Sequence, residues 1–272
     1  MKVLVTDPIS DDGKQILTDA NIKVEDASGE KSSSKLDLSD INGWIVRSGT
    51  TVTAKNIEQA ENLRVIGRAG VGVDNIDIHA ATMKGVLVMN TPNANTISAT
   101  EHTVALILAL ARNVHEGYHS MIHGNWEREK LIGTELRNKT IGVVGLGKIG
   151  TEVIKRLHPF KINVLGFDPY IKKNNYELDY VEIVKLDDLC EKSDFITIHV
   201  PKTDSTIGLF DLDRLKMMKP TAQIINCARG GIIDEDALLI ALNDGMISGA
   251  ALDVFENEPV IDSPLIRAKN IL

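Results

Sequence analysis

The sequence predicts an α/β fold with two doubly wound, parallel-sheet domains separated by a cleft. Short apolar segments alternate with helical stretches along the whole chain, and a glycine-rich turn follows one of these segments at residue 145. Charged side chains also follow several of the expected strand ends. Short buried strands that alternate with helices are typical of a parallel sheet covered by helices on both faces.

The first domain is predicted to span residues 1–92. Residues 3–5 are apolar and are followed by Asp7 and Pro8, which indicates a buried strand that ends in a loop. We expect a helix at residues 12–19 and a polar turn at residues 29–34. Other short apolar segments predict strands at residues 22–24, 45–46, 65–66 and 86–89.

The second domain is predicted to span residues 93–272. It opens with the longest helical pattern, residues 98–122, which is apolar around most of its circumference. Such a helix is buried, either within the chain or against a partner subunit. A loop is expected at residues 124–137, which contain Trp126. Because the helix and this loop present more apolar surface than one domain can cover, we expect a homodimer. Strands are expected at residues 141–144, 163–167, 195–199, 224–226 and 249–253.

Composition excludes several classes of protein. Of 272 residues, 43% are hydrophobic, and 38 acidic against 30 basic residues give a net charge of −8, which disfavours binding to a nucleic-acid backbone. Two cysteines, Cys190 and Cys227, form no CxxC pair and suit a reducing compartment. The longest apolar run, residues 104–111, is shorter than the roughly 20 residues of a membrane span. The amino terminus reaches a charge too early for a signal peptide, so we expect a cytoplasmic protein without membrane contact.

The glycine-rich turn predicts a dinucleotide site in a Rossmann-like domain. Gly145, Gly147 and Gly150, with Lys148 and Ile149 between them, follow one expected strand and open an expected helix at residues 151–157. Glycines at this spacing allow a tight turn, a close approach of pyrophosphate and close packing of helix on strand. Asp168, at the end of the next strand, can accept hydrogen bonds from a ribose diol, which favours NAD over NADP. Lys172 and Lys173 lie close enough in sequence to weaken that preference.

Other charged residues follow the later strands. Arg229 comes just after residues 224–226 and can bind a carboxylate with its planar fork, although a bond to a loop carbonyl fits its position equally well. Asp253 is a candidate for the nicotinamide carboxamide, and Glu258 or Glu256 could orient a histidine. His199 is expected to be a packing residue more than a catalytic one.

Three histidines recur at helical spacing near the end of the long helix, which raises the question of a metal site. Histidines at this spacing can bind a metal, but they also suit the carboxyl end of a helix. Because no cysteine or acidic ligand joins them in a motif, we predict no metal. The three are His115, His119 and His123.

Taken together, these segments resemble the D-isomer-specific 2-hydroxyacid dehydrogenases, and in particular the branch that oxidises 3-phospho-D-glycerate. The resemblance runs from residue 3 to residue 272 and implies NAD-dependent oxidation of a 2-hydroxy acid. Glyoxylate, hydroxypyruvate or D-lactate-type reduction is the alternative, and an NAD-sensing co-repressor-like binding protein is an alternative of another class. The resemblance is carried by the glycine-rich turn and by residues 46–48, 67–75, 88–93, 125–128, 226–231 and 253–255.

The resemblance also implies roles for single residues. Arg229 would hold the substrate carboxylate, and Glu258 would pair with the catalytic histidine. Further cofactor contacts are implied for Val71, Val200, Cys227 and Ala228, beside Asp168 and Asp253. Substrate contacts are implied for Arg47, Ser48, Gly72 and Asn95, and for Arg128 near a dimer interface.

The acid/base histidine of the family is expected outside the sequence. By family spacing it falls about four residues beyond Leu272, and loss of a general base typically costs on the order of 10²–10⁴ in rate. A polypeptide ending at Leu272 is therefore expected to have little activity.

Overall fold

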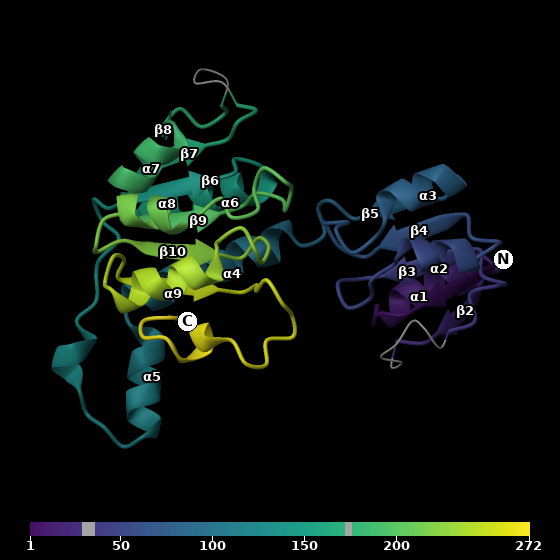
Figure 1. The fold of residues 1–272 in the computed structure, drawn as a ribbon, viewed down its shortest axis with the longest axis horizontal. Coiled ribbons are helices and arrows are strands. Elements are labelled where there is room, and N and C mark those ends of the chain that lie inside the picture. The colour runs from purple at the N-terminus through teal and green to yellow at the C-terminus, as the bar shows by residue number, and fades with distance from the viewer. Residues whose placement is uncertain (29–35, 172–175) are drawn as a thin grey trace. The chain divides into compact units, whose positions relative to one another are not determined.

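The computed structural model describes residues 1–28, 36–171 and 176–272. These residues form two compact units, Met1–Asn95 (unit 1) and Thr96–Leu272 (unit 2) (Figure 1). The boundary predicted from the sequence, after residue 92, lies just before this division. The polar turn predicted at residues 29–34 and the lysines Lys172 and Lys173 lie outside the described residues.

Unit 1 is a parallel five-stranded sheet in the order β2-β1-β3-β4-β5. Trp44, Leu4, Ile41 and Ile66 are fully buried in its core. Side chains that accept a backbone N–H begin each helix, as Ser10 does for the first. The strands are β1 (Lys2–Val5), β2 (Lys23–Asp26), β3 (Gly43–Val46), β4 (Val65–Arg68) and β5 (Leu87–Asn90), and the helices are α1 (Asp11–Asp19), α2 (Ala54–Gln59) and α3 (Ile78–Lys84).

Unit 2 is a parallel six-stranded sheet in the order β11-β10-β9-β6-β7-β8. The chain leaves the central strand β6 in one direction through β7 and β8, and in the other through β9, β10 and β11. The point where the direction changes, between β6 and β9, is where open α/β sheets bind ligands at their carboxyl ends. The strands are β6 (Thr140–Val144), β7 (Asn163–Phe167), β8 (Val181–Ile183), β9 (Phe195–Ile198), β10 (Gln223–Asn226) and β11 (Gly249–Leu252).

Apolar side chains cover both faces of this sheet, as expected for parallel strands. On one face Val143 and Ile225 pack with Ile107 and Ile154 from two helices. On the other face Ile224 packs with Leu189 and Leu238. The helices of the first face are α4 (Thr96–Ala111) and α6 (Lys148–Leu157), and those of the second are α7 (Leu186–Lys192), α8 (Leu212–Met217) and α9 (Glu235–Asn243).

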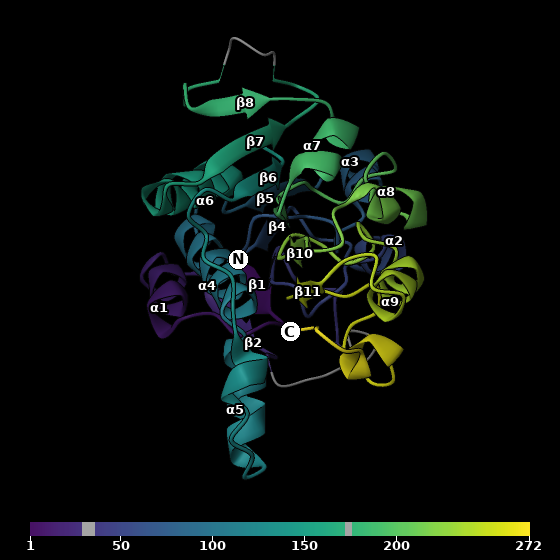
Figure 2. The same cartoon turned by 90° about the vertical axis from the view of Figure 1, so that its left-hand side faces the viewer.

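The prediction of one long helix over residues 98–122 is wrong. Asn113 adopts a left-handed conformation (φ 51°), which ends α4 and starts a second helix, α5 (Val114–Ile122). Asparagine tolerates this conformation better than most residues. The predicted burial holds for α4, whose Ile107 and Leu110 are buried, but α5 projects from the sheet and exposes its apolar side chains (Figures 1 and 2).

Short elements escape the sequence analysis. The edge strand β8 has only three residues with a polar one between two apolar ones, so it carries no clear strand signal. The expected loop at residues 124–137 contains the 3₁₀ helix η2 (Arg128–Leu131). Two further 3₁₀ helices are η3 (His158–Phe160) and η4 (Pro264–Arg267). No helix within the described ranges is both long and apolar enough to cross a membrane.

Candidate active site

Close backbone contacts fix the glycine-rich turn between β6 and α6. Gly145 has a left-handed φ of 94°, and a Cβ there would lie 2.5 Å from the carbonyl oxygen of His199. A Cβ on Gly150 would collide with the carbonyl of Gly145. Both positions therefore require glycine, one for the path of the turn and the other for packing the helix against it.

Gly147 differs from these two glycines because it faces open space. Nothing lies within 4 Å of a Cβ built on it. Gly147 is the N-cap of α6, and within the described part of the chain no side chain caps this helix end. The helix begins at Lys148, three residues before the predicted start, because Gly150 belongs to its first turn and Gly147 is its N-cap. Open space before an uncapped helix amino end suits the pyrophosphate of a dinucleotide.

Asp168 lies directly beside the turn. Its Oδ2 accepts the backbone N–H of Leu146 (3.0 Å), and its Oδ1 accepts that of Tyr170 (2.9 Å). These bonds hold the carboxylate at the carboxyl end of β7, next to the end of β6. A partly exposed carboxylate in this position can accept hydrogen bonds from ribose hydroxyls, so the residues fit NAD.

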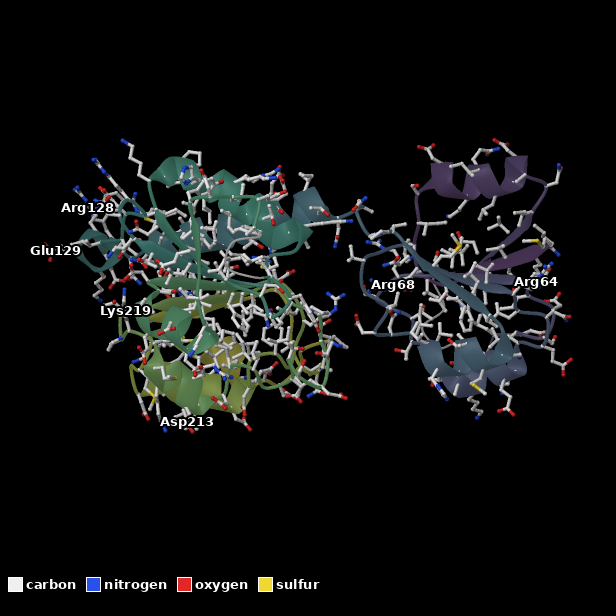
Figure 3. The ribbon with its side chains drawn as sticks, turned by 90° about the horizontal axis from the view of Figure 1, so that it is seen from above. Arg64, Arg68, Arg128, Glu129, Asp213 and Lys219 are labelled. Carbon is white, nitrogen blue, oxygen red and sulfur yellow. The ribbon has the colours of Figure 1, made fainter. Side chains whose placement is uncertain are left out.

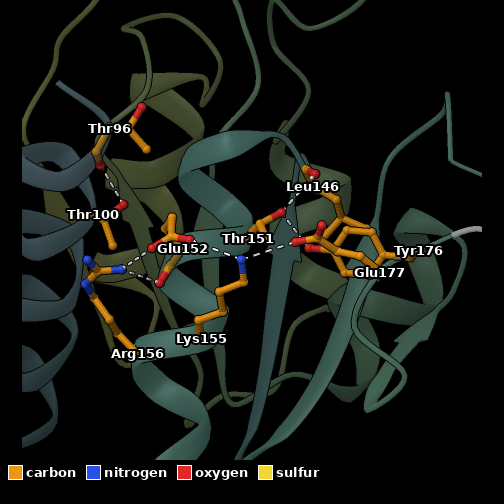
Figure 4. Close-up of polar contacts among 9 residues, drawn as sticks. All are labelled: Thr96, Thr100, Leu146, Thr151, Glu152, Lys155, Arg156, Tyr176 and Glu177. Carbon is orange, nitrogen blue, oxygen red and sulfur yellow. Dashed lines mark hydrogen bonds and ion pairs between the residues drawn. The ribbon is translucent and has the colours of Figure 1, made fainter. Parts of the chain in front are cut away.

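Polar contacts tie α6 to the turn and to the segment before β8 (Figure 4). The Thr151 hydroxyl donates to the carbonyl of Leu146 (3.2 Å) and shares a hydrogen bond of 2.7 Å with the Tyr176 hydroxyl. Lys155 lies 3.3 Å from Glu177. The buried Thr151 contact fixes the helix start, whereas the exposed ion pair contributes little to stability.

Arg229 lies in a turn organised by a buried asparagine. Asn226, at the end of β10, donates from Nδ2 to the carbonyl of Arg229 (2.9 Å) and accepts the N–H of Ala228 at Oδ1 (3.0 Å). The half-buried Arg229 guanidinium donates to the carbonyl of Ala228 (2.7 Å). Asn226 is not among the predicted site residues, although its position at a strand end before a turn marks it as a candidate.

The segment after β11 packs against this turn. A Cβ on Gly230 would collide with the backbone of Phe255, so the two loops touch directly. Glu258 accepts the N–H of Phe255 (3.0 Å), and the N–H of Glu256 donates to the carboxylate of Glu235. The structure thus brings the Arg229 turn and the acidic segment 253–258 together at one sheet edge.

Two residues of α4 also reach this edge. His102 Nε2 lies 3.2 Å from Asp253 Oδ1, and both side chains are about half exposed, at 48% and 50%. Thr103 forms a hydrogen bond with Cys227, while burial raises the pKa of the Cys227 thiol to about 11. Cys227 is therefore a neutral thiol at pH 7. No sequence pattern singles out His102, because only the packing of α4 on β10 and β11 places it there.

His199 behaves as the packing residue expected from its sequence position. Its Nε2 forms a hydrogen bond with the Thr197 hydroxyl (3.0 Å), and burial lowers its pKa to about 4. The next residue, Val200, lies against the glycine-rich turn, since a Cβ on Gly145 would come within 2.9 Å of its Cγ1.

In unit 1, the predicted substrate residues follow β3, β4 and β5. Arg47 and Ser48 are exposed directly after β3, and the backbone N–H of Arg47 donates to Asp7 (2.6 Å). Val71 and Gly72 are half-buried after β4, where the Asn90 side chain donates to the carbonyl of Val71 (2.6 Å). Asn95, the last residue of the unit, is exposed.

Arg128 does not join the other predicted residues of unit 2. It lies in η2, exposed at the periphery of the unit beside Glu129 (Figure 3). Its neighbours Glu127 and Lys130 line a cavity of about 560 Å³ together with Gln223 and Gly249, the first residues of β10 and β11. The cavity therefore lies at the amino ends of these strands, whereas the glycine-rich turn lies at the carboxyl ends of the sheet.

The same cavity is lined by two histidines of α5 and by the histidine that is its C-cap residue. His115, His119 and His123 line it, and the rings of the last two lie 4.3 Å apart. Among the residues that the structure describes, no group of three histidine, cysteine or acidic side chains is arranged to hold a metal ion.

Comparison with known proteins shows which family the chain matches. Residues 104–272 match the model described as D-isomer specific 2-hydroxyacid dehydrogenase, NAD binding domain. The whole chain is 48% identical to D-3-phosphoglycerate dehydrogenase of Methanocaldococcus jannaschii and 45% identical to that of Homo sapiens, covering 52% and 51% of those proteins. The chain therefore spans about half the length of these curated relatives.

Solved structures with the same fold include two that contain NAD. NAD-dependent formate dehydrogenase from Staphylococcus aureus, in complex with NAD, is 32% identical, with a TM-score of 0.90 over 100% of this chain and 87% of that one. D-lactate dehydrogenase from Aquifex aeolicus, complexed with NAD and lactic acid, is 26% identical, with a TM-score of 0.88 over 100% and 87%.

Proposed function

The chain belongs to the D-isomer specific 2-hydroxyacid dehydrogenases, and from this premise we propose that the full-length protein oxidises a D-2-hydroxy acid with NAD, with 3-phospho-D-glycerate as substrate and 3-phosphohydroxypyruvate as product. One observation carries the proposal. The glycine-rich turn, Asp168 and the Arg229 turn all lie at the carboxyl edge of the unit 2 sheet. The identity of 45–48% to D-3-phosphoglycerate dehydrogenases supports the choice of substrate.

The geometry of unit 2 supports the proposed cofactor contacts. The uncapped start of α6 at Gly147, with Lys148 and Ile149 in its first turn, would hold the pyrophosphate. Asp168 would bind the adenosine ribose, and Asp253, oriented by His102, would bind the carboxamide. Val200, Cys227 and Ala228 would provide the weakly polar surroundings of the nicotinamide ring. Bound NAD supplies the electron acceptor for oxidation of the C2 hydroxyl.

The chemical roles of the chain are substrate binding and orientation. Arg229 would bind the carboxylate with two parallel hydrogen bonds and polarise the C2 oxygen. Glu258 would orient a histidine that takes the hydroxyl proton. Arg47, Ser48, Gly72 and Asn95 of unit 1 are assigned to the rest of the substrate. A neutral Cys227 thiol adds no competing charge.

The proposal includes a homodimer formed through the arm, which we define as residues 114–132. Four side chains of α5, at positions 114, 118, 121 and 122, form one apolar stripe that is 55–69% exposed, and Trp126 and Ile132 extend it at 75% and 81%. Exposed apolar surface of this extent marks a protein interface. Arg128 is remote from Arg229 within its own unit, so a second copy would also explain how Arg128 can bind a substrate phosphate.

Sedimentation velocity tests the arm. Ile122→Glu is expected to give a monomer at micromolar concentration, whereas Ile16→Glu, which changes a 70% exposed isoleucine on α1, is expected to leave the dimer intact. A wild-type protein that sediments as a monomer would contradict the dimer. The cytoplasmic location predicted from the sequence stays a prediction.

An assay of the full-length protein tests the reaction. NADH absorbance is followed with 3-phospho-D-glycerate, glycerate, D-lactate and the matching 2-keto acids. We expect the phosphorylated pair to give the highest kcat/KM, and Arg229→Lys to lower it by about a hundredfold, because lysine keeps the charge but loses the planar fork. A good rate with glycerate and none with the phosphorylated acid would overturn the substrate assignment. Turnover of none of these acids would overturn the reaction itself.

A further inference from the structure

The loop that follows β3, residues 47–50, is held in place by two polar side chains from other segments of unit 1, the buried Asp7 and the half-buried Asn75. We propose that Asp7 and Asn75 are positioning residues that set the conformation of this loop and so present Arg47 and Ser48 to the substrate. The inference rests on the proposed function, which assigns Arg47 and Ser48 to the substrate.

Asp7 holds the amide side of the loop. It lies just past β1, with only 7% of its surface exposed. Its Oδ2 accepts the backbone N–H groups of Arg47 (2.6 Å) and Thr50 (3.1 Å). Two charge-assisted hydrogen bonds to one buried oxygen fix the curvature of the chain between the two donors. The fit is close, because a Cβ on Gly49 would lie 2.5 Å from Asp7 Oδ1.

Asn75 holds the carbonyl side of the same two residues. Its Nδ2 donates to the carbonyl of Arg47 (2.6 Å) and to that of Thr50 (2.5 Å). The backbone carbonyl of Asn75 accepts the N–H of Val52 (2.8 Å), so the residue that follows the loop closely is bound to Asn75 as well. Asp7 therefore binds the N–H groups of Arg47 and Thr50, and Asn75 binds the carbonyls of the same two residues.

Further contacts stabilise this arrangement. The Thr50 hydroxyl bonds to the Thr6 hydroxyl (3.0 Å), which in turn accepts the indole N–H of the fully buried Trp44 (3.0 Å). The Arg47 guanidinium donates to the carbonyl of Pro8, beside Asp7, at 3.3 Å. The side chain of Arg47 is thus oriented by the same segment that binds its backbone.

The location of these contacts indicates a role beyond stability. The side chains of Arg47 and Ser48 are exposed, whereas the groups that hold their backbone are buried or half-buried beneath them. An exposed loop without such contacts samples several conformations, and substrate binding would then carry the cost of ordering it. A loop already held in one conformation avoids that cost.

A matched control exists at the amino ends of the strands in the same sheet. Asn42 accepts the N–H of Lys2 (2.9 Å) and donates to the carbonyl of Asn62 (3.4 Å). Its carbonyl accepts the N–H of Arg64, which marks the amino end of β4, while Arg68 marks the carboxyl end (Figure 3). Asn42 is therefore an asparagine of similar bonding whose loss affects unit 1 without touching residues 47–50.

Steady-state kinetics of the full-length protein test the proposal. Asp7→Ala and Asn75→Ala are expected to raise KM for the 2-hydroxy acid by roughly ten- to a hundredfold with a smaller change in kcat. NAD affinity, measured separately by fluorescence titration, is expected to stay unchanged because the cofactor contacts of unit 2 are intact. Asp7→Asn keeps an oxygen acceptor and is expected to recover most of the loss. Asn42→Ala is expected to lower the melting temperature and leave KM as in the wild type.

The outcomes separate this inference from the proposed function. Absence of turnover in the unchanged protein overturns both. Normal wild-type turnover, with KM in Asp7→Ala and Asn75→Ala no higher than in Asn42→Ala, overturns only the positioning role. If alanine at position 7 prevents folding, Gly49→Ala provides the test, since its Cβ displaces the Asp7 carboxylate and is expected to raise KM in the same way.

Discussion

Replacing the glycines of the turn one at a time separates the cofactor site from the fold that supports it. In Gly147→Ala the backbone stays extended (φ −73°, ψ −163°), a conformation that alanine adopts, and the new methyl group meets no atom within 4 Å. The structural cost is then the preference for glycine over alanine at an N-cap, about 1 kcal/mol. The methyl group would instead occupy the space in which a pyrophosphate approaches the start of α6.

The loss of cofactor affinity can be worked from this geometry. Pushing the pyrophosphate away costs at least one charge-assisted hydrogen bond to a helix amide, about 1.5–3 kcal/mol. That corresponds to a roughly ten- to hundredfold higher Kd for NAD. Gly150→Ala acts differently, because its Cβ collides with the carbonyl of Gly145 and forces α6 off the turn. We expect it to cost about 1–3 kcal/mol or more in the free energy of unfolding.

Two measurements on the same variants check this prediction. Fluorescence titration gives Kd for NAD, and thermal unfolding gives the melting temperature, which falls by roughly 2–4 °C per kcal/mol for a unit of this size. Gly13→Ala on α1 is the control, since its Cβ makes ordinary contacts at 3.4 and 3.7 Å, and its NAD affinity is expected to be unchanged. The reasoning is refuted if Gly147→Ala binds NAD as tightly as the wild type.

Three further predictions concern unit 2. Burial lowers the pKa of His199 to about 4, so this histidine takes up a proton near pH 6.5 in the unfolded protein but not in the folded one. The free energy of unfolding therefore has its full value above that pH and falls by about 2 kcal/mol by pH 5. His199→Asn should flatten this pH dependence in urea unfolding, and an unchanged slope would contradict it. Asp168→Asn keeps an acceptor for the Leu146 N–H but removes the charge, so KM for NAD should rise about ten- to hundredfold and the preference over NADP should shrink; equal discrimination in both proteins would argue against the ribose role. Asn226→Ala should cost about 1–3 kcal/mol in unfolding free energy and also lower kcat/KM, because it releases the Arg229 turn; loss of stability alone, with kinetics unchanged, would make Asn226 purely structural.

The arm shows where sequence periodicity misleads. Apolar residues continue at helical spacing across residue 113, so the pattern predicts one helix. The left-handed conformation of Asn113 is a single backbone choice that leaves no trace in that pattern. The predicted start of α6 differs from the observed one for a related reason. Glycine is a poor helix former in general, but Gly150 is required in the first turn of this helix.

The sequence by itself determined the two parallel sheets, the glycine-rich turn and the pairing of that turn with Asp168. These features depend on short-range signals: apolar strands of a few residues, glycines at fixed spacing, and an acidic residue at the end of the next strand. Only the tertiary structure decided that His102 contacts Asp253 and that Asp7 and Asn75 bind residues 47–50. It also decided that the segment around Arg128 lies near the amino ends of β10 and β11. Those contacts join residues from 25 to more than 100 positions apart. Strand order and helix packing set them, and neither can be read from local residue patterns.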